Sequence, residues 1–585
     1  MIGNAREIPA NQTLQCDVCI VGGGAAGISI AKELAGSNLR IILLEGGGKK
    51  ETAEARDLYR GAAWPEKSHE PLEENRRRQW GGTTAVWGGR CVPLDPIDLE
   101  KRDWIPHSGW PITWAQLEPY YAQANTLCEA GAAAYRADVV FPDAPREIIA
   151  GFDGRDVVSW PLERWGPPTH FGKRYGAELA AAQNVTVLLN ANCLHVQLAP
   201  NGASVTHIEA SSSNANRFRV AARCFVLACG GLENARLLLA SHDVHPTGVG
   251  NQTDQVGRYY MSHLVGSFAR ARLRDVNGSL VYDFERDAEG VYCRRRFWIT
   301  PEAQANEQIG SAIGFFFRPQ LGQSPHRNGL FSATYLTKFM LGTLKRRSVR
   351  GAIGRIRKNR ATLAEHLKIV LADAPGLAPQ TCRVVRDRWF AQRRLPYVLP
   401  PKSDNNFHLF YQAEHAPNPA SRVVLSAQRD ALGMPRLEAR IAFSQIDVRT
   451  VLAAHQLMKR RFEESGTGEL VFDDAALLEK LESDIKHFNS SAHHMGTTRM
   501  GTDPHTSVVD GNCRVHGVQN LYVAGASVFP TSGHANPTLT LVALAIRLAE
   551  HLKLTPRPEI ALDTPAPRSD FRPSVESRGE PSVSP

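Results

Sequence analysis

The spacing of apolar and turn-forming residues near the N-terminus predicts a strand, a tight turn, a helix and a second strand. An apolar run at 17–21 ends in the glycines 22–24, and apolar residues at helical spacing follow over 28–34. A second apolar run at 40–44 ends at Glu45. Strand, glycine turn, helix and strand in this order and length are typical of one βαβ unit.

The glycine turn has the GxGxxG spacing, at Gly22, Gly24 and Gly27. In a βαβ unit these glycines allow the tight turn, the close approach of a pyrophosphate and the packing of helix against strand. N–H groups at the start of the helix bind such an anion. Glu45, about twenty residues further on, is placed to accept hydrogen bonds from a ribose. The segment therefore predicts a site for a nucleotide cofactor.

Similar α/β segments recur in the middle and at the end of the chain. The apolar runs predict strands over 184–198, 205–210, 224–228 and 520–526, and helices over 234–240 and 538–552. We therefore expect a cofactor-binding fold assembled from discontinuous segments, with the residues between them forming a second domain. A length of 585 residues fits two joined domains.

A strongly basic segment interrupts the second half of the chain. Residues 341–360 carry eight Lys or Arg and no acidic residue, and apolar residues are interleaved among them. Their spacing predicts a basic amphipathic helix, which would serve as a lid, as a docking surface for an acidic partner or as a membrane-surface contact. An ordinary solvated helical insertion explains the same pattern.

The composition is that of an ordinary globular protein, with 43% hydrophobic and 22% charged residues. A net charge of +9 is modest for this length, and we expect no nucleic-acid partner. No apolar run reaches the roughly 20 residues of a membrane span, and residues 1–15 lack the pattern of a secretion signal. The ten scattered cysteines favour reduced thiols. These features predict a cytoplasmic protein.

Two strings near the C-terminus carry the candidate chemistry. His493 lies in SSAHHMGTTRMG at 490–501, and Asn536 lies in GHANPTLT at 533–540. The unperturbed pKa of histidine, near 6.5, suits a general base at neutral pH, and an asparagine amide can hydrogen-bond the same substrate oxygen. Because His493 and His494 are adjacent, without the i, i+4 spacing of a helical zinc site, we expect no metal.

Together with the glycine loop and the segment WGGTTAVWGG at 80–89, these strings resemble the GMC (glucose–methanol–choline) flavin oxidoreductases. The resemblance covers the first half of the chain and the C-terminal hundred or so residues. It implies an α/β fold, with a Rossmann-like FAD-binding domain and a second α+β domain built on an antiparallel sheet. The expected division is an FAD-binding domain at 1–95, 185–270 and 505–555, a substrate-binding domain at 96–184 and 271–504 with a basic helical insertion around 338–395, and a disordered tail at 556–585.

The resemblance also implies which residues contact FAD. The glycine loop would hold the pyrophosphate, Glu45 the adenosine ribose, and the segment 81–89 would approach the isoalloxazine ring. The expected cofactor-binding residues are Gly22, Gly24, Ala26, Gly27, Glu45, Gly82, Thr83, Val86, Trp87, Gly88, Val196, Ala228, Gly525, Ala526, Pro537 and Thr538. Relatives that link FAD covalently carry a histidine where this chain has Val86, so we expect non-covalent FAD.

By the same resemblance, the chain is an enzyme that oxidises a CH–OH group of a sugar, glycoside or polyol by hydride transfer to flavin N5. It is most similar to the pyranose oxidase and gluconate/fructose dehydrogenase branch, in which His493 would be the general base and Asn536 would orient the substrate oxygen. Other histidines, such as His263, are expected to be structural. The residues expected to border the substrate are Gln412, Glu414, His494 and His534, although a surface carboxylate fits Glu414 equally well.

Two alternatives have the same fold: a flavin-containing lyase, and the catalytic subunit of a membrane-peripheral dehydrogenase complex that passes electrons to a quinone or cytochrome. The sequence leaves the electron acceptor open between O₂, a quinone and a redox protein. Large relatives often self-associate, so a homo-oligomer is compatible with the resemblance.

Overall fold

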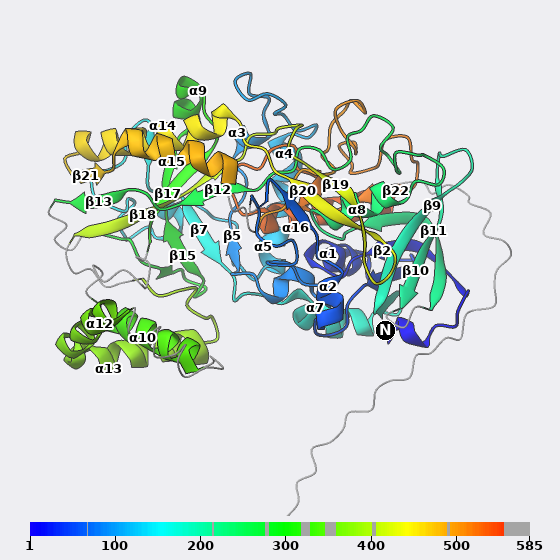
Figure 1. Cartoon of the computed structure of the whole chain (residues 1–585), viewed down its shortest axis with the longest axis horizontal. Coiled ribbons are helices and arrows are strands. Elements are labelled where there is room, and N and C mark those ends of the chain that lie inside the picture. The colour runs from blue at the N-terminus through cyan, green and yellow to red at the C-terminus, as the bar shows by residue number, and fades with distance from the viewer. Residues whose placement is uncertain are drawn as a thin grey trace, which may run out of the picture.

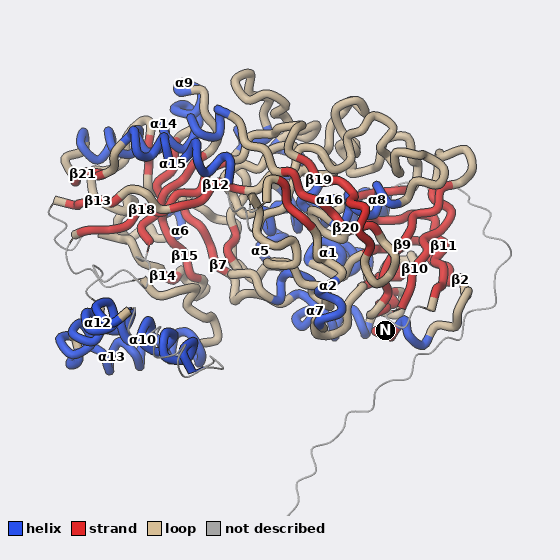
Figure 2. The backbone as a smooth tube through the Cα atoms, in the orientation of Figure 1, coloured by secondary structure: helices blue, strands red, loops and turns tan. Residues whose placement is uncertain are grey.

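The computed structural model describes residues 1–66, 68–212, 216–274, 280–317, 328–344, 359–399, 405–487 and 492–554. Two lobes lie side by side, and a group of helices is set apart from the left-hand lobe in the view of Figure 1. Strands run through both lobes, with helices around them (Figure 2). The predicted disordered tail and most of the basic segment, at 345–358, lie outside the described residues.

An eight-stranded sheet forms the first lobe. Its order is β1 (Ile2–Asn4), β8 (Val185–Leu189), β3 (Ile41–Glu45), β2 (Thr13–Val21), β11 (Arg217–Leu227), β10 (Val205–Ser212) and β9 (Ala191–Leu198), with β22 (Leu521–Val523) also paired to β11. Strands β1, β8, β3, β2, β11 and β22 are parallel, whereas β11, β10 and β9 pair antiparallel. Strands from the start, middle and end of the chain therefore meet in one sheet, as predicted for the α/β fold.

The predicted βαβ unit is confirmed as β2, helix α1 (Ala25–Leu34) and β3. All five residues of β3 are buried, as expected for a parallel strand covered on both faces. The predicted strand 184–198 is instead two strands, β8 and β9. The chain turns between them at Asn190, which has a positive φ of 57°, a conformation that asparagine tolerates better than most residues.

Helices cover the first sheet. Helix α16 (Pro537–Leu554) packs against α1 and against α5 (Pro119–Leu127), and α1 also packs against α7 (Phe171–Ala181). Helix α8 (Glu233–Ala240) packs against β9 and begins one residue before the predicted helix. The shorter helices nearby are α2 (Ala53–Asp57), α3 (Pro96–Leu99), α4 (Trp114–Leu117) and α6 (Ala137–Val140).

The second lobe contains an antiparallel sheet, in agreement with the prediction. Its order is β21 (Gly468–Val471), β13 (Arg270–Leu273), β18 (Asn406–Glu414), β17 (Ala312–Phe317), β16 (Phe297–Ile299) and β6 (Val157–Val158), with β12 (His263–Gly266) also paired to β18. Helix α14 (Gln445–Glu464) packs on this sheet and against α15 (Asp474–His487). This lobe has its own apolar core, which includes Phe152, Phe297 and Phe462.

Two smaller sheets accompany the two large ones. One contains β14 (Glu285–Arg286), β15 (Tyr292–Arg295), β7 (Leu162–Trp165) and β5 (Arg90–Cys91); the other contains β19 (Arg422–Arg429), β20 (Pro435–Arg440) and β4 (Ala62–Trp64). Apolar residues of the β19–β20 hairpin, such as Val423 and Leu437, belong to the first lobe's core although their sequence position is in the predicted second domain. The domain boundaries stay a prediction.

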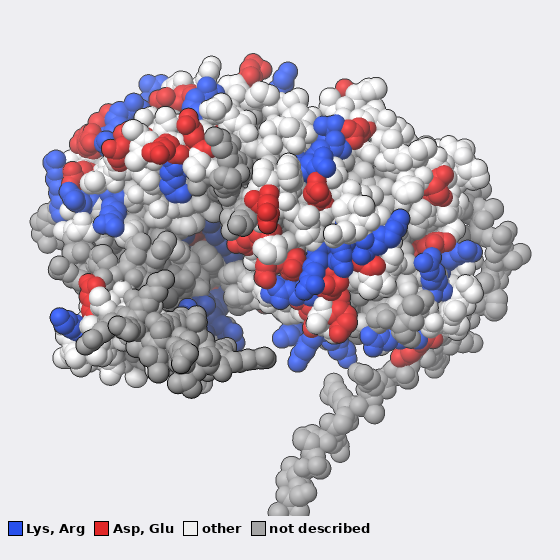
Figure 3. Space-filling model, viewed as in Figure 1, with Lys and Arg blue, Asp and Glu red and all other residues white. Residues whose placement is uncertain are grey.

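The set-apart helical group consists of α10 (Gly329–Leu344), α12 (Arg360–Ala372) and α13 (Ala374–Val385), followed by a π-helical turn at Arg386–Phe390; a further short helix, α9 (Pro301–Glu307), lies elsewhere in the second lobe. The group is a helical insertion at the predicted place. On the face drawn in Figure 3, basic and acidic side chains lie interspersed over both lobes. Among the described residues, no helix combines the length and the apolar character that crossing a membrane requires.

Candidate active site

One cavity of about 610 Å³ lies between the lobes and joins the glycine loop to the C-terminal His493 and Asn536. Most of the residues that the sequence singled out line it. They are Gly22, Gly24, Ala26, Glu45, Gly82, Thr83, Val86, Trp87, Gly88, Ala228, Gly525, Ala526, Pro537 and Thr538 among the predicted cofactor residues, His493 and Asn536 as the predicted catalytic pair, and Gln412 and His494 among the predicted substrate residues.

The glycine loop has the shape that a pyrophosphate needs. Gly22 has a φ of 112°, and a Cβ there would lie 2.4 Å from the carbonyl oxygen of Ala228, so only glycine fits. Gly24 has no neighbouring atom within 4 Å of a Cβ position and leaves the cavity open beside it. Helix α1 begins there without a side-chain cap, so its first N–H groups are free to bind an anion.

Glu45 is fixed at the end of β3 by two backbone N–H groups. Gly23 donates to Oε2 at 2.9 Å, and Gly47 donates to Oε1 at 2.7 Å. Burial raises the pKa of Glu45 to about 7, although these two N–H groups and the charge of Arg78 act in the opposite direction. Each carboxylate oxygen keeps a second lone pair, so the residue is still able to accept a hydrogen bond from a ribose.

Three consecutive arginines also line the cavity near the glycine loop, and the sequence analysis did not single them out. Arg76 pairs with Glu233 at 3.0 Å, and Arg78 donates to Asn192 at 2.9 Å. Arg77 lies between them, and Thr83 Oγ1 accepts its backbone N–H. The available signal was a basic triplet directly before the glycine segment at 80–89. The glycine loop, Glu45 and these cations together fit the pyrophosphate and ribose of a dinucleotide.

The predicted catalytic pair is in direct contact at the other end of the cavity. Asn536 Nδ2 lies 3.2 Å from His493 Nε2, and His493 Nδ1 lies 2.8 Å from Nδ1 of His263. Gln412 Nε2 donates to Asn536 Oδ1 at 3.1 Å, and Arg90 donates to Gln412 Oε1 at 3.0 Å. One chain of hydrogen bonds therefore runs from Arg90 to His263 through His493.

Arg90, at the start of this series of hydrogen bonds, determines which atom donates in each of them. A guanidinium only donates, so Gln412 must accept from Arg90 through its oxygen, and its amide nitrogen then donates to the carbonyl of His534 and to Asn536. Asn536 in turn donates to Nε2 of His493. The proton of neutral His493 is therefore on Nδ1, where it is donated to His263, and the Nε2 lone pair faces Asn536 and the cavity.

The environment keeps His493 neutral. Burial, together with the smaller effect of the charge of Arg90, lowers the pKa of His493 to about 4. His263, which the sequence analysis treated as structural, lies on β12 at the position paired with Glu414 of β18. No local pattern marked His263, because its contact with His493 joins residues 230 positions apart.

His494 faces a different environment from His493. Its ring stacks on His69, with ring centroids 5.7 Å apart and 14° between the planes, and also lies against Tyr260. Burial, with the neighbouring His69 and Arg76, holds the pKa of His494 well below its usual value. The ring therefore packs against His69 and Tyr260 where His494 lines the cavity.

Four predicted site residues do not line the cavity. Gly27 packs against the strand, since a Cβ there would lie 1.9 Å from Gly22 O. Val196 is fully buried, and its N–H donates to Ser241 at 2.9 Å, so its placement does not support a contact with adenine. Glu414 was predicted to face substrate. It is instead buried in a bidentate pair with Arg102, at 2.6 and 2.8 Å.

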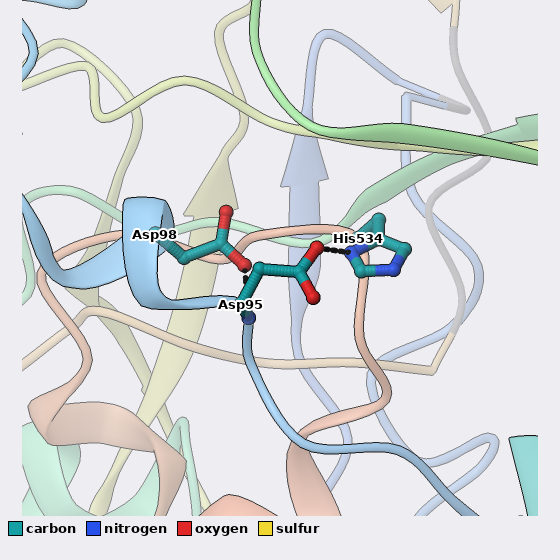
Figure 4. A group of neighbouring side chains, drawn as sticks. All are labelled: Asp95, Asp98 and His534. Carbon is teal, nitrogen blue, oxygen red and sulfur yellow. Dashed lines mark hydrogen bonds and ion pairs between the residues drawn. The ribbon is translucent and has the colours of Figure 1, made fainter. Parts of the chain in front are cut away.

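The fourth residue is His534, which Figure 4 shows beside Asp95 and Asp98. His534 is fully buried, and its Nδ1 lies 3.7 Å from Asp95 Oδ2. Ligand atoms of these three residues lie within 4.8 Å of one another. The carboxylates already have protein donors, because Asp98 accepts from the N–H of Asp95 at 2.9 Å and Asp95 accepts from Trp298 at 2.7 Å. His534 reaches the site through its backbone carbonyl, which accepts from Gln412.

Comparison with known proteins agrees with this geometry. Residues 417–545 match the family model described as GMC oxidoreductase. The chain is 23% identical to the fructose dehydrogenase large subunit of Gluconobacter japonicus, over 92% of this chain and 98% of that protein. It is 25% identical to the paromamine 6'-oxidase of Streptomyces fradiae, over 91% of this chain and 90% of that protein. By the family match, the chain is similar to the GMC oxidoreductases over residues 417–545.

A solved structure supports the same fold. The chain is similar to the pyridoxine 4-oxidase of Mesorbium loti with a TM-score of 0.53 and 17% sequence identity, over 92% of this chain and 99% of that chain. At this identity the similarity concerns the fold, a mixed α/β architecture.

Proposed function

We propose that the chain oxidises a CH–OH group of a sugar, glycoside or polyol, with FAD as the hydride acceptor and His493 as the general base. The observation that carries the proposal is the contact between His493 Nε2 and Asn536 Nδ2 in the same cavity as the glycine loop. Relatives named as a fructose dehydrogenase large subunit and a paromamine 6'-oxidase support this substrate class.

FAD, when bound, supplies the hydride-accepting chemistry. The residues that would hold it are the glycine loop at its pyrophosphate, Glu45 at its ribose and the N-terminus of α16, with Pro537 and Thr538, at the flavin end. The N-terminus of a helix favours negative charge. We propose non-covalent attachment, since Val86 has no nucleophilic atom with which to form a link.

The side chains are arranged to take a proton from a substrate hydroxyl. In this proposal the substrate hydroxyl replaces the contact between Asn536 and His493: the Nε2 lone pair of His493 accepts its proton, and Asn536 Nδ2 donates to the same oxygen and orients it. His263 accepts the Nδ1 proton of His493 and so holds the reactive tautomer. The lowered pKa of His493 keeps the imidazole unprotonated at neutral pH.

The walls of this end of the cavity suit a carbohydrate. Trp87, Trp165, Val265 and Phe410 line it and offer apolar faces to C–H groups. Gln412, on the strand paired with Val265, supplies a polar contact. Few polar groups among apolar walls are typical of small-molecule sites.

The electron acceptor is the point on which the two relatives differ, since one is named as a dehydrogenase subunit and the other as an oxidase. Quinone, redox protein and O₂ therefore stay as candidate acceptors, with the lyase as the non-redox alternative. Three further expectations also stay predictions: a membrane or acidic-partner contact through 341–360, a homo-oligomer and a cytoplasmic location. The ten cysteines, all free thiols, support the cytoplasmic location.

An anaerobic titration tests the proposed function. Purified protein with bound FAD is mixed with sugars, glycosides and simple polyols while the visible flavin absorbance is followed, and air is then admitted. Bleaching by one class of hydroxyl compound is expected, and rapid return of colour in air would identify an oxidase. Absence of bleaching by every hydroxyl compound would contradict the proposal.

A further inference from the structure

The side-chain amide of Gln412 is held between one group that can only donate and one that can only accept. Arg90 donates to Oε1 at 3.0 Å, and Nε2 donates to the backbone carbonyl of His534 at 2.5 Å. Either contact alone would impose the same orientation of the amide, because a guanidinium has no acceptor and a carbonyl oxygen has no donor. The side chain is buried, and its strand β18 is paired on both sides, with Val265 and Ile313 opposite Gln412. The amide therefore has one orientation available.

This orientation leaves Gln412 little capacity to bind a substrate. The two N–H groups of Nε2 are matched by two acceptors, the carbonyl of His534 and Oδ1 of Asn536, the latter at 3.1 Å. Oε1 accepts from Arg90 and keeps one lone pair. Gln412 lines the cavity, but its hydrogen bonds go to the protein. Its position therefore indicates a role that it exerts through Asn536.

The orientation of Asn536 follows from that of Gln412. Because Gln412 Nε2 donates, the atom of Asn536 that faces it has to be Oδ1, and Nδ2 is then the atom that lies 3.2 Å from His493 Nε2. An amide nitrogen only donates, so Nε2 of His493 has to offer its lone pair. The reversed orientation of Asn536 would place Oδ1 against Nε2 and would favour a proton on that nitrogen, where a general base needs a lone pair.

We propose that Gln412 is a positioning residue that sets the reactive tautomer of His493 through Asn536. The inference rests on the proposed function, because a lone pair at Nε2 matters only if His493 removes a proton from the substrate. His263 contacts the other ring nitrogen of His493, but an imidazole nitrogen can either accept or donate there. The partners of Gln412 cannot exchange their roles, so the direction of the hydrogen bonds is decided at Gln412.

Two substitutions of Gln412 distinguish positioning from substrate binding. Gln412→Glu keeps the size of the side chain but offers only acceptors, so Asn536 should turn Nδ2 toward the carboxylate and Oδ1 toward His493. The limiting rate of flavin reduction should then fall by about 10²- to 10⁴-fold, because the proton of His493 moves to Nε2. Gln412→Met leaves Asn536 without a partner that fixes it, and the rate should fall by only about 3- to 10-fold. Rapid mixing of the flavin-loaded protein with substrate under anaerobic conditions gives the limiting rate and the half-saturating concentration.

A control variant and the two kinetic constants exclude simpler roles. A residue that only binds substrate would raise the half-saturating concentration in both variants and leave the limiting rate unchanged, and this result would overturn the inference. Gln304→Glu is the matched control, because Gln304 is also fully buried and donates to a backbone carbonyl, that of Ile299, at 3.0 Å, but does not line the cavity. Its limiting rate should equal that of the wild type. A loss as large as in Gln412→Glu would assign the effect to the burial of a carboxylate and would also overturn the inference.

A spectroscopic measurement tests the tautomer without turnover. The histidine rings of the flavin-loaded protein are labelled with ¹⁵N, and the signals of His493 are identified by their loss in His493→Gln. We expect the proton on Nδ1 in the wild type and on Nε2 in Gln412→Glu, since the ¹⁵N chemical shift distinguishes an N–H from a lone pair. A wild-type proton on Nε2, which no variant is needed to detect, would overturn the inference, and so would the same tautomer in both proteins. If no hydroxyl compound bleaches the wild-type flavin but the tautomer still changes, the proposed function fails and the positioning by Gln412 is supported.

Discussion

The two ends of the cavity are built in different ways. At the nucleotide end, backbone geometry makes the site: Gly22, Gly24 and the start of α1 are neighbours in sequence, and Glu45 is held by two backbone N–H groups. At the catalytic end, side chains make the site, and Arg90, His263, Gln412, His493 and Asn536 come from distant segments. Local pattern therefore specifies one end, and tertiary structure specifies the other.

The largest effect is expected at the catalytic end. His493→Ala removes the proposed base and should slow flavin reduction by about 10²- to 10⁴-fold while FAD stays bound. His494→Phe is the control, because a phenyl ring can keep the stacking on His69 and Tyr260. Rapid-mixing measurements of flavin bleaching compare the two. Equal losses in both variants would contradict the distinction between a catalytic and a packing histidine.

Glu414→Gln should damage the fold more than the chemistry. The change leaves Arg102 charged and without its partner in a place where both side chains are 1% exposed. Breaking a buried pair of this kind lowers the free energy of unfolding by about 3–5 kcal/mol. Chemical denaturation provides the measurement, and Glu302→Gln, which removes an exposed partner of Arg155, is the control. A stable variant with a raised KM would instead return Glu414 to the substrate site.

Two glycine substitutions at the nucleotide end of the cavity distinguish the packing of the fold from the binding of FAD. Gly27→Ala places a methyl group 1.9 Å from Gly22 O and should lower the free energy of unfolding by about 1–3 kcal/mol. Gly24→Ala places its methyl group in open space, so the apoprotein should keep its stability and lose affinity for FAD. Thermal denaturation and FAD titration are the two measurements. A Gly24→Ala variant that loses stability, together with a Gly27→Ala variant that loses only FAD affinity, would contradict the roles given to these two glycines.

Removing the partner of His493 should have a smaller effect. His263→Phe deletes the acceptor for the Nδ1 proton, and loss of one neutral hydrogen bond corresponds to roughly 3- to 10-fold in the rate of flavin reduction. His263→Asn, which retains an acceptor oxygen, should recover part of the rate. The pH profile should move in His263→Phe, because the tautomer is no longer fixed. An unmoved profile would assign His263 to packing alone.

The smallest effect is expected from mild acid. The pKa of His493 is lowered to about 4, so the base stays unprotonated from pH 8 down to about pH 5, and the rate of flavin reduction should fall only as the pH approaches 4. The stability of the folded protein should begin to fall at a higher pH than the rate does. Histidines with lowered folded-state pKa values, such as His263 and His494, take up protons in the unfolded chain below about pH 6.5. Melting temperatures should therefore decrease below that pH. A rate that already halves near pH 6.5 would contradict the environment described for His493.

The comparison also explains what could be predicted from the sequence. The βαβ unit was predictable because its apolar spacing and glycines are local, and the division at Asn190 was missed because a left-handed residue inside an apolar stretch leaves a weak signal. His493 and Asn536 were identified through motifs. Glu414 was misplaced because its partner Arg102 lies 312 positions away, and the contact of His263 with His493 was missed for the same physical reason.

The most direct test of the central claim is stoichiometric. The flavin-loaded protein is mixed anaerobically with a limiting amount of a hydroxyl compound that it accepts, and the carbonyl product and flavin bleaching are measured together. The account predicts one carbonyl formed for each flavin reduced in the wild type, at a rate reduced by about 10²- to 10⁴-fold in His493→Ala. Conversion of substrate to a carbonyl product without any flavin bleaching would contradict oxidation by hydride transfer and would favour the lyase.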